Sequence, residues 1–503
     1  MTRWAWVIDQ TRCIGCHACT TACKSENDVP VGVFRTWVKN VEVGTFPEVK
    51  RHFAVLRCNH CEDPPCVEVC PVTAMYQRPD GLVDFDHDAC IGCKACMQAC
   101  PYDAIYMDPD SNTAAKCNFC SHRVDEGLLP ACVVVCPEEA LLFGDLEDPT
   151  SKVSRALKEH DVSVRRPEQG THPHAFYIGA HDATLEPLAV RHDATYMWSD
   201  RGARDRRERT PLPLYKEKAA PPARVAYDVP RQRTWGWPVS SYIWTKGIAA
   251  GLGMLAGIGQ FVDLGLGDRL LRIVAPIVAL VFLGITGALL VGDLKRPERF
   301  WTILTRPQWR SWLARGAVII TIYGALLTVW LALAWFESAA LRGVIAGLLV
   351  VGGALTAGYT APLLAQCEGR DLWQSRLLLP HLLVHAFAGG LAVLIFADAV
   401  SGISGSRSLV DAFVVAAIAA GALALADGFK RHHTSNATAA AHALTRGTQA
   451  RLFWLSLALG VVLAVPLAFA GLAGLLAAPL LALAGLWLHG HAFILAGQGP
   501  PIS

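Results

Sequence analysis

The pattern of apolar residues divides the chain into two parts. Up to about residue 185, apolar residues form short runs between polar ones, as at 4–9, 82–85 and 176–178. Such runs predict short strands, here in an α+β domain. From Tyr242 almost to the end, long apolar stretches follow one another. Each is long enough to cross about 30 Å of hydrocarbon as a helix of roughly 20 residues.

Eight such stretches predict an all-α bundle of eight transmembrane helices within residues 235–503. We place the spans at 242–264, 272–294, 313–336, 341–364, 378–400, 408–430, 451–472 and 475–496. The composition agrees, because 52% hydrophobic residues and a mean hydropathy of +0.32 are too apolar for a soluble chain. An even number of spans returns both ends of the bundle to one side of the membrane.

Between the two parts, residues 186–234 have a basic and proline-rich composition. Five arginines lie between positions 201 and 209, and four prolines follow between 211 and 222. Such a segment does not bury a core, so it predicts a linker or an extended strap. The net charge of +2 gives no indication of a nucleic-acid partner.

The charged connections between the spans predict an orientation. Twelve lysines and arginines lie in the connections after the second, fourth and sixth spans, whereas four lie in the opposite connections. Basic residues collect on the cytoplasmic side of membrane proteins. Both ends of the bundle, and the domain that precedes it, are therefore expected on the cytoplasmic side of the inner membrane.

The cysteines indicate the chemistry of the first part. Sixteen of the seventeen lie before residue 137 and fall into four groups. The groups are Cys13, Cys16, Cys19 and Cys23; Cys58, Cys61, Cys66 and Cys70; Cys90, Cys93, Cys96 and Cys100; and Cys117, Cys120, Cys132 and Cys136. Each supplies three thiolates and a fourth after three further residues, as in bacterial ferredoxins, where the fourth ligates the partner cluster. This spacing predicts four 4Fe–4S clusters in a tandem ferredoxin-like domain, residues 1–185.

The same rule predicts which cysteines share a cluster. In the outer pair, Cys136 completes the first group and Cys23 completes the fourth, while in the inner pair Cys100 completes the second and Cys70 the third. Zinc ribbons and a disulfide scaffold are the alternatives. Both fit poorly, because the first and third groups are too tightly spaced for two ribbons and the chain opens without a visible export signal.

Two stretches of the membrane part carry a family resemblance. Residues 292–300 read Gly-Asp-Leu-Lys-Arg-Pro-Glu-Arg-Phe and resemble the Asp-Leu-Gly-Arg-Pro loop of NrfD-like polysulfide-reductase membrane subunits, with Lys295 where the family commonly has glycine. Residues 358–360 and 496–498 add weaker support. Residues 1–185 resemble the four-cluster electron-transfer subunit of complex iron–sulfur molybdoenzymes, of the dimethyl sulfoxide reductase and polysulfide reductase type. The chain thus looks like a fusion of two subunits.

The resemblance implies a function and a partner. It implies electron transfer between the membrane quinone pool and a separate catalytic subunit that carries a molybdopterin cofactor, with the chain also serving as the membrane anchor. Some relatives replace one cysteine of the third group and hold a three-iron cluster, but Cys93 occupies that place here, so four 4Fe–4S clusters are expected. A cluster domain in the cytoplasm favours a sulfite-dehydrogenase-like complex as the assembly to which the chain belongs.

The parity of the spans predicts where quinone reacts. Lys246 near the start of span one, Asp293 at the end of span two, Tyr359 near the end of span four, and His381 with His385 near the start of span five share one membrane face. A quinone site needs titratable groups beside a cluster, and histidine suits proton exchange. We therefore expect a quinone pocket there. The competing interpretation is that these side chains anchor helix ends.

Two other functions remain open from the sequence. The chain could be a haem-bearing membrane cytochrome, because His381 and His385 in span five and His489 and His491 in span eight lie at membrane depth. No haem is expected, since ligation needs facing helices and a histidine pair on one helix favours a quinone or proton site. The chain could also be the electron-transfer and anchor subunit of a hydrogenase.

Overall fold

A computed structural model describes residues 2–192, 223–232, 234–335, 339–401 and 407–503. The chain forms two compact units, which are described separately. Unit 1 comprises residues 1–234 together with 367–370 and 500–503, and unit 2 comprises residues 235–366 and 371–499. Each unit thus contains segments that are distant in sequence.

Unit 1 is built around a four-stranded sheet. Its strands, in spatial order, are β8 (Leu141–Asp145), β1 (Trp4–Asp9), β10 (Ala175–Ile178) and β9 (Val162–Ser163). Strand β1 pairs antiparallel with β8 and parallel with β10. Helix α6 (Lys152–Glu159) packs on this sheet, where Val153 and Ala156 join Ala5 and Val7 in a small core. The sheet therefore joins the two sequence ends of the cysteine-rich region.

A second sheet lies beside the cysteine-bearing segments. Its order is β11 (Ala223–Tyr227), β2 (Thr36–Thr45) and β3 (Glu48–Arg57), all antiparallel. Strand β11 falls within residues 186–234, which the composition predicted as a linker. Alternation explains the strand, because Ala223 and Val225 are buried with Val41 whereas Arg224 is exposed. Most of the predicted linker, residues 193–222, lies outside the described residues.

Short elements make up the rest of unit 1. Two antiparallel ribbons pair β4 (Met75–Gln77) with β5 (Val83–Phe85) and β6 (Ile105–Met107) with β7 (Ala114–Lys116). The helices are α1 (Ala18–Glu26), α2 (Pro65–Glu68), α3 (Ala95–Ala99), α4 (Ser121–Val124), α5 (Ala131–Val134) and α7 (Asp182–Leu185). Four of them, α1, α2, α3 and α5, contain cysteines. Unit 1 is therefore an α+β fold, as the sequence predicted.

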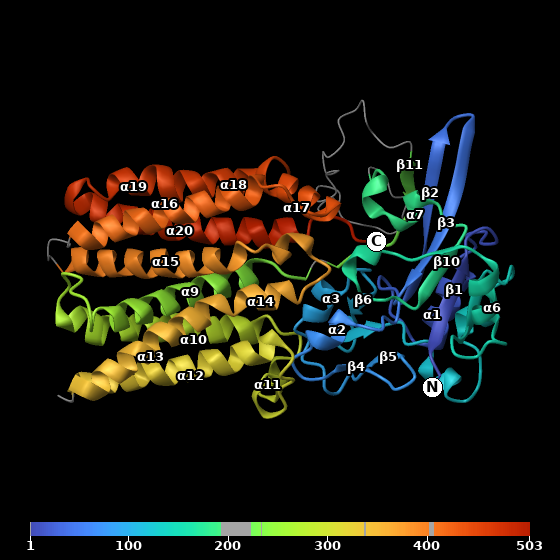
Figure 1. The fold of residues 1–503 in the computed structure, drawn as a ribbon, viewed down its shortest axis with the longest axis horizontal. Coiled ribbons are helices and arrows are strands. Elements are labelled where there is room, and N and C mark those ends of the chain that lie inside the picture. The colour runs from blue at the N-terminus through green and yellow to red at the C-terminus, as the bar shows by residue number, and fades with distance from the viewer. Residues whose placement is uncertain (1, 193–222, 233, 336–338, 402–406) are drawn as a thin grey trace. The chain divides into compact units, whose positions relative to one another are not determined.

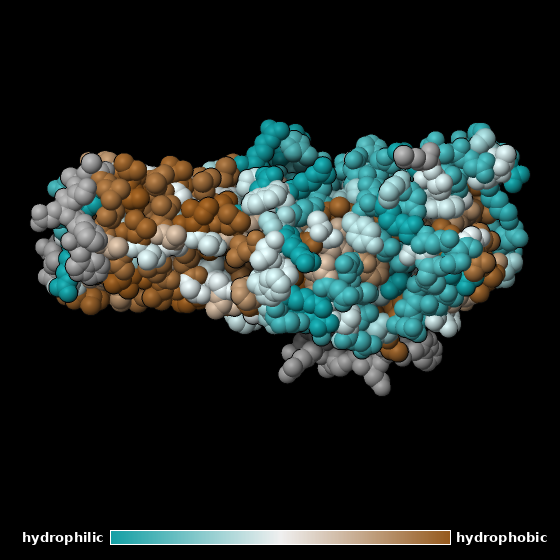
Figure 2. All heavy atoms as spheres, turned by 90° about the horizontal axis from the view of Figure 1, so that it is seen from below, coloured by the Kyte–Doolittle hydropathy of each residue, from teal (hydrophilic) through white to brown (hydrophobic). Residues whose placement is uncertain are grey.

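Unit 2 is helical. Its long helices are α9 (Trp237–Ile258), α10 (Ala275–Gly292), α12 (Trp312–Ala332), α13 (Ala339–Gly358), α15 (Leu378–Val400), α16 (Arg407–Phe429) and α20 (Gly471–Gly497). Shorter ones are α11 (Thr302–Thr305), α14 (Thr360–Ala365), α17 (Ser435–Thr445), α18 (Ala450–Leu457) and α19 (Ala464–Leu467). Hydrophobic side chains make up most of the face of this unit drawn in Figure 2, as expected of a surface in contact with lipid.

Seven helical segments of the described residues are long and apolar enough to cross a membrane, against the eight predicted. They are 270–292, 312–332, 341–365, 378–400, 407–429, 450–467 and 471–497. The predicted first span corresponds to α9, which is a helix of 22 residues but is not among the seven. Polar side chains in its first half, including Thr245 and Lys246, reduce its hydropathy.

Helix α9 is nevertheless the inner helix of the bundle. It lies between α15 and α10 (Figure 1), and all residues from Ile248 to Gly257 are buried. Small residues allow this close packing, because a Cβ atom at Gly251 would lie 1.9 Å from the carbonyl oxygen of Ala386 on α15. The polar residue Thr245 finds a partner in Thr286 of α10, with 2.8 Å between the hydroxyl oxygens.

The two ends of unit 2 meet. The backbone N–H of Trp235 donates to Oε1 of Gln498 at 3.2 Å, and Nε2 of Gln498 donates to the carbonyl oxygen of Trp235 at 2.8 Å. The ring of Trp235 also stacks on Trp373, with 5.5 Å between the centroids. The start of α9 and the end of α20 therefore lie at the same end of the bundle.

The contact at Gly251 predicts a loss of stability on substitution. We expect Gly251→Ala to lower the free energy of unfolding of the bundle by about 1–3 kcal/mol, because the added methyl group collides with backbone that cannot move independently. Thermal unfolding in detergent measures the effect. The control is Gly284→Ala on α10, where nothing lies within 4 Å of the added atom. Equal unfolding temperatures for both variants would contradict the packing argument.

Candidate functional site

The first and third cysteine groups fold into the same loop. Gly15 and Gly92, each followed directly by a cysteine, have φ of 70° and 69°, and His17 and Lys94 have φ of 63° and 65°. These left-handed residues curl the chain so that successive thiols converge. Glycine is required at position 15, where a Cβ atom would lie 2.3 Å from the ring of Phe53.

Helices then separate the last two cysteines of each group. On α1, Cys19 and Cys23 lie four residues apart, and on α3 and just beyond it Cys96 and Cys100 have the same spacing. Helix α1 packs against α5 of the fourth group, and α2 packs against α3. This arrangement places the fourth thiol of one group beside the first three thiols of another.

Three cavities of unit 1 are each lined by four cysteines. One is lined by Cys13, Cys16, Cys19 and Cys136, a second by Cys58, Cys61, Cys66 and Cys100, and a third by Cys70, Cys90, Cys93 and Cys96. These are three of the four sets that the spacing predicts. The structure thus brings these thiols together across groups, and their role as cluster ligands stays a prediction.

The remaining cysteines also converge. The side-chain amide of Asn27 donates to both Cys23 Sγ at 3.9 Å and Cys120 Sγ at 3.7 Å. Burial, and then the nearby thiols of Cys132 and Cys120, raise the pKa of Cys23 to about 12. Cys117 interacts electrostatically with the same three thiols. The fourth predicted set is therefore also assembled.

The chemistry of the thiols suits iron–sulfur clusters. Burial raises the pKa of Cys19 and Cys100 to about 11 and that of Cys93 to about 12. Such thiols would be protonated at neutral pH, and metal ligation replaces those protons. Backbone N–H groups point at the sulfur atoms, from Ala140 to Cys136 at 3.3 Å and from Ala114 to Cys90 at 3.5 Å. Hydrogen bonds of this kind help to set cluster potentials.

One buried cation lies among the outer thiols. Arg57, at the end of β3, is fully buried, and its Nη1 donates to Cys132 Sγ at 3.2 Å. Its guanidinium group stacks over the ring of Trp6 at 4.2 Å. It also interacts electrostatically with Cys19, which belongs to the other outer set. The sequence does not indicate that Arg57 lies beside Cys132, because only the fold brings the end of β3 to that cysteine.

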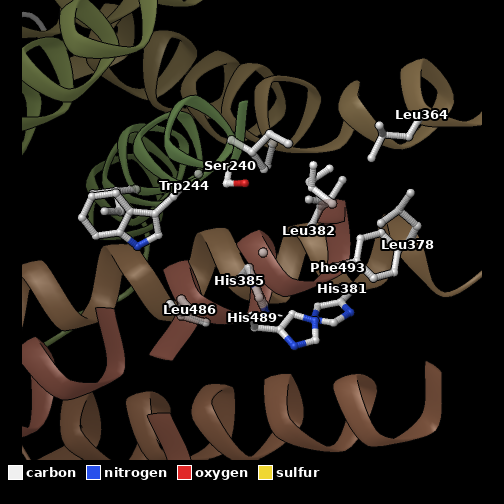
Figure 3. A pocket seen from close by; sticks show the side chains of 16 residues that line it. Ser240, Trp244, Leu364, Leu378, His381, Leu382, His385, Leu486, His489 and Phe493 are labelled. Atoms are coloured by element: carbon white, nitrogen blue, oxygen red, sulfur yellow. Dashed lines mark hydrogen bonds between the residues drawn. The ribbon is translucent and has the colours of Figure 1, made fainter. Parts of the chain in front are cut away.

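Unit 2 contains a cavity lined by three histidines. Helix α15 contributes His381 and His385, helix α20 contributes His489, and apolar side chains including Trp244 and Phe493 line most of the remainder (Figure 3). The Nε2 atoms of His381 and His385 lie 2.8 Å apart. The ring of His381 stacks on that of His489, with 4.7 Å between the centroids.

The other predicted quinone residues lie elsewhere in unit 2. Lys246 of α9 donates to the hydroxyl of Thr360, and its Nζ lies 3.9 Å from the centroid of the Tyr359 ring. Neither Lys246 nor Tyr359 lines the cavity, but Gly247, which follows Lys246, and Ala357, two residues before Tyr359, do. Asp293 caps the end of α10 and does not line the cavity.

His489 was not predicted as part of the quinone site. From the sequence it is only a histidine of the last span, about a hundred residues beyond His385. The spacing along the helix could have indicated that His489 faces the inside of the bundle, because His489 and the buried Phe493 share one face of α20. Which helix that face would meet is set by packing rather than by the sequence of α20.

Comparisons with known proteins identify both parts of the chain. The profile of a family described as "Polysulphide reductase, NrfD" matches residues 228–499, more than half of the chain. The chain belongs to the NrfD family. Two profiles described as "4Fe-4S dicluster domain" match residues 6–74 and 49–146 of this NrfD protein, which cover the four cysteine groups.

Individual relatives match the first part. The tetrathionate reductase B subunit of Salmonella typhimurium is 48% identical over 193 residues, covering 38% of this chain and 77% of the relative. The sulfite dehydrogenase B subunit of Allochromatium vinosum is 42% identical over 200 residues, covering 35% and 83%. The arsenate respiratory reductase iron–sulfur subunit of Shewanella sp. is 39% identical over 226 residues, covering 35% and 96%.

These matches confirm the predicted fusion. The chain joins an iron–sulfur electron-transfer region, of the kind found in the B subunits of molybdoenzyme-type reductases, to an NrfD membrane domain. It is therefore a multi-pass membrane protein that carries iron–sulfur clusters.

The position of Arg57 predicts an effect on one cluster. If Cys132 ligates a cluster, removing this buried positive charge in Arg57→Met disfavours the reduced, more negative state, so the reduction potential of that cluster falls. A redox titration followed by electron paramagnetic resonance measures the shift. Arg57→Lys keeps the charge and should recover part of it.

The matched control is Arg51→Met, six residues earlier on the same strand. The Arg51 side chain is 53% exposed and pairs with Glu42, so its loss should leave every cluster potential unchanged. Unchanged potentials in an Arg57→Met protein with its full iron content would contradict the prediction.

Proposed function

We propose that this NrfD protein passes electrons between the membrane quinone pool and a molybdopterin-containing catalytic subunit through four 4Fe–4S clusters. The observation that carries the proposal is the assembly of sixteen thiols into four sets, each completed by a cysteine from another group. In a two-cluster ferredoxin the fourth cysteine of a run ligates the other cluster, which is the same arrangement.

The four sets support four clusters of the same type. Cys93 lines the cavity of the third group, in the place where some relatives of the family lack a ligand. Each set contains four thiols, as a four-iron cluster requires. The cofactors carry the redox chemistry, and the chain supplies the ligands, the burial and the hydrogen bonds.

The catalytic partner is inferred from the relatives. Those that match the first part are named as B or iron–sulfur subunits of tetrathionate, arsenate and selenate reductases and of a sulfite dehydrogenase. This chain would therefore exchange electrons with a separate catalytic subunit and anchor that subunit at the membrane. A sulfite-dehydrogenase-like complex fits a cluster domain on the cytoplasmic side. A hydrogenase partner is the second candidate, and the catalytic subunit that copurifies distinguishes the two.

The quinone site is proposed at the histidine cavity of unit 2. The cavity is largely apolar, as a quinone ring requires, and His381 and His385 are placed to exchange protons with it. Lys246 and Tyr359 contact each other beside the cavity, since Gly247, the residue after Lys246, is part of its lining. Asp293 lies at the end of α10 and outside the cavity, so any role of its carboxylate would be confined to that helix end. Histidines of the facing helices α15 and α20 do meet here, so the absence of a facing helix no longer argues against haem. The direct contact between their rings favours quinone instead, because it leaves no space for a haem between them.

The topology is proposed to be eight crossings in the cytoplasmic membrane. The hydrogen bonds between Trp235 and Gln498 support an even number, which requires α9 to cross in addition to the seven apolar segments. Burial of α9 inside the bundle explains how a less apolar helix would remain in the membrane. The basic connections favour the cytoplasmic side for the iron–sulfur region.

Iron content tests the cluster assignment. Protein purified anaerobically should contain about sixteen irons per chain, four for each cluster. Cys136→Ser should lose cluster iron although it lies more than a hundred residues from Cys13, since both line one cavity. Cys367→Ser is the control, because that cysteine belongs to none of the four sets. An iron count near eight, or zinc in place of iron, would refute four clusters.

Single substitutions test the quinone site. We expect Lys246→Met, Tyr359→Phe and His385→Gln to slow oxidation of a quinol analogue, or reduction of a quinone analogue, at least tenfold at unchanged iron content. Each substitution removes a polar group at or beside the cavity. The controls are Tyr323→Phe on α12, a buried tyrosine that donates to backbone carbonyls of α9, and His433→Gln, an exposed histidine. Normal quinone kinetics in all three test variants would place the pocket elsewhere.

A further inference from the structure

Three imidazole groups converge within unit 2. His381 and His385 lie one turn apart on α15, and His489 reaches them from α20 (Figure 3). One ring nitrogen from each lies within 4.8 Å of the other two. The ring centroids are 4.3, 4.7 and 5.5 Å apart, so the three rings form a single cluster. Two of the three residues, His381 and His489, are 5% and 6% exposed.

Hydrogen bonds satisfy only some of the ring nitrogens of these three histidines. The bond between the Nε2 atoms of His381 and His385 satisfies one nitrogen of each ring. Nδ1 of His489 is buried and has no hydrogen-bond partner among the described residues. A buried polar atom without a partner costs about 1–3 kcal/mol. A ligand that accepts the lone pair of this nitrogen would remove that cost.

We propose that His381, His385 and His489 bind a divalent transition-metal ion. Neutral imidazole nitrogen is a ligand suited to zinc, copper, nickel and iron. Two histidines at positions i and i+4 on one helix present both rings on one face, which is a recurrent way to hold such an ion. The third ligand comes from a facing helix, so the site is enclosed from two sides.

The distances fit a metal-binding geometry. Zinc–nitrogen bonds of about 2.0–2.1 Å in a tetrahedron separate two ligand nitrogens by about 3.4 Å. The observed separation of 2.8 Å between His381 and His385, and the limit of 4.8 Å for the whole set, lie on either side of that value. Small side-chain rotations therefore suffice. Three protein ligands leave a fourth position, which here would open toward the cavity that the three residues line.

The surroundings of the three histidines include one buried carboxylate. Asp427 of α16 is 2% exposed and interacts electrostatically with His489. Its Oδ1 pairs with Lys430 at 2.6 Å, while Oδ2 is buried without a hydrogen-bond partner among the described residues. The rings of Phe453 and Phe493 lie 6.0 and 6.4 Å from the His489 ring and limit access from that side. The site thus combines nitrogen ligands with a nearby carboxylate and apolar walls.

The proposal goes beyond the quinone site and does not depend on it. An ion held by three imidazoles would be present whether or not quinone reacts in the cavity. If quinone does bind there, the fourth position would accept an oxygen ligand. Because a metal-bound imidazole nitrogen cannot accept a proton, proton exchange would then depend on Lys246 and Tyr359 beside the cavity. Quinol kinetics and metal content are separate measurements, so the failure of one proposal can be distinguished from the failure of the other.

Zinc binding by the full chain tests the proposal. Protein purified anaerobically from cells supplied with Zn²⁺ should retain one zinc per chain. Its zinc K-edge X-ray absorption should show a first shell of nitrogen and oxygen at about 2.0 Å, without sulfur at about 2.3 Å. No bound zinc, or a shell that contains sulfur, would overturn the proposal, since sulfur would place the metal at the cysteines. The wild-type spectrum is decisive even if a histidine variant fails to fold.

Two variants and a control locate the ion. His489→Phe and His385→Gln should each lose the zinc while keeping the iron content of the wild type. The control is His491→Gln on the same helix, because His491 bonds to Ser240 Oγ at 3.1 Å and is not among the three ligands. Retention of zinc in both test variants would also overturn the proposal.

Discussion

The third and fourth thiols of each cysteine group cannot complete the same cavity, because a short helix or turn carries one of them away from the other. Cys19 and Cys23 illustrate this on α1, where they approach different sets of thiols. No group can therefore assemble its own site, and each half of unit 1 is needed to complete the other. Strand β1 has a central role here, because its pairing with β8 and β10 joins residues 4–9 to residues 141–178. The contacts that fold unit 1 are therefore also the contacts that assemble its sets of thiols.

A comparable dependence holds in unit 2. Helix α9 carries Lys246, a residue that is expensive in an apolar environment. Its side chain is fully buried and is stabilised by the Thr360 hydroxyl and by the face of the Tyr359 ring, both supplied by chain more than a hundred residues later. The histidine cavity is likewise made from helices that are distant in sequence. Polar groups in this bundle are tolerated where a later helix provides their partner.

Much of this arrangement could be predicted from the sequence, for identifiable physical reasons. Cysteine spacing has a strict geometric meaning, so the four sets could be written down before the fold was known. Long apolar stretches predict long helices just as directly, and the predicted span at 378–400 coincides with α15. Contacts between helices have no such signature, which is why His489 was not placed with His381 and why Asp293 was expected at the cavity. Strand β11 was missed because five residues in a basic, proline-rich segment carry too weak an alternation.

The composition of α9 also bears on how the chain enters the membrane. On the scale of translocon insertion, a lysine at the centre of a helix opposes insertion by roughly 2.5–3.5 kcal/mol. Helix α9 is the first of the bundle to be synthesised, yet its neighbours α13 and α15 emerge about a hundred residues later. The helix that begins the bundle is thus the one least able to enter lipid alone. If α9 crosses the membrane as proposed, its insertion would be cooperative, with α9 held at the translocon or at the interface until its partner helices arrive.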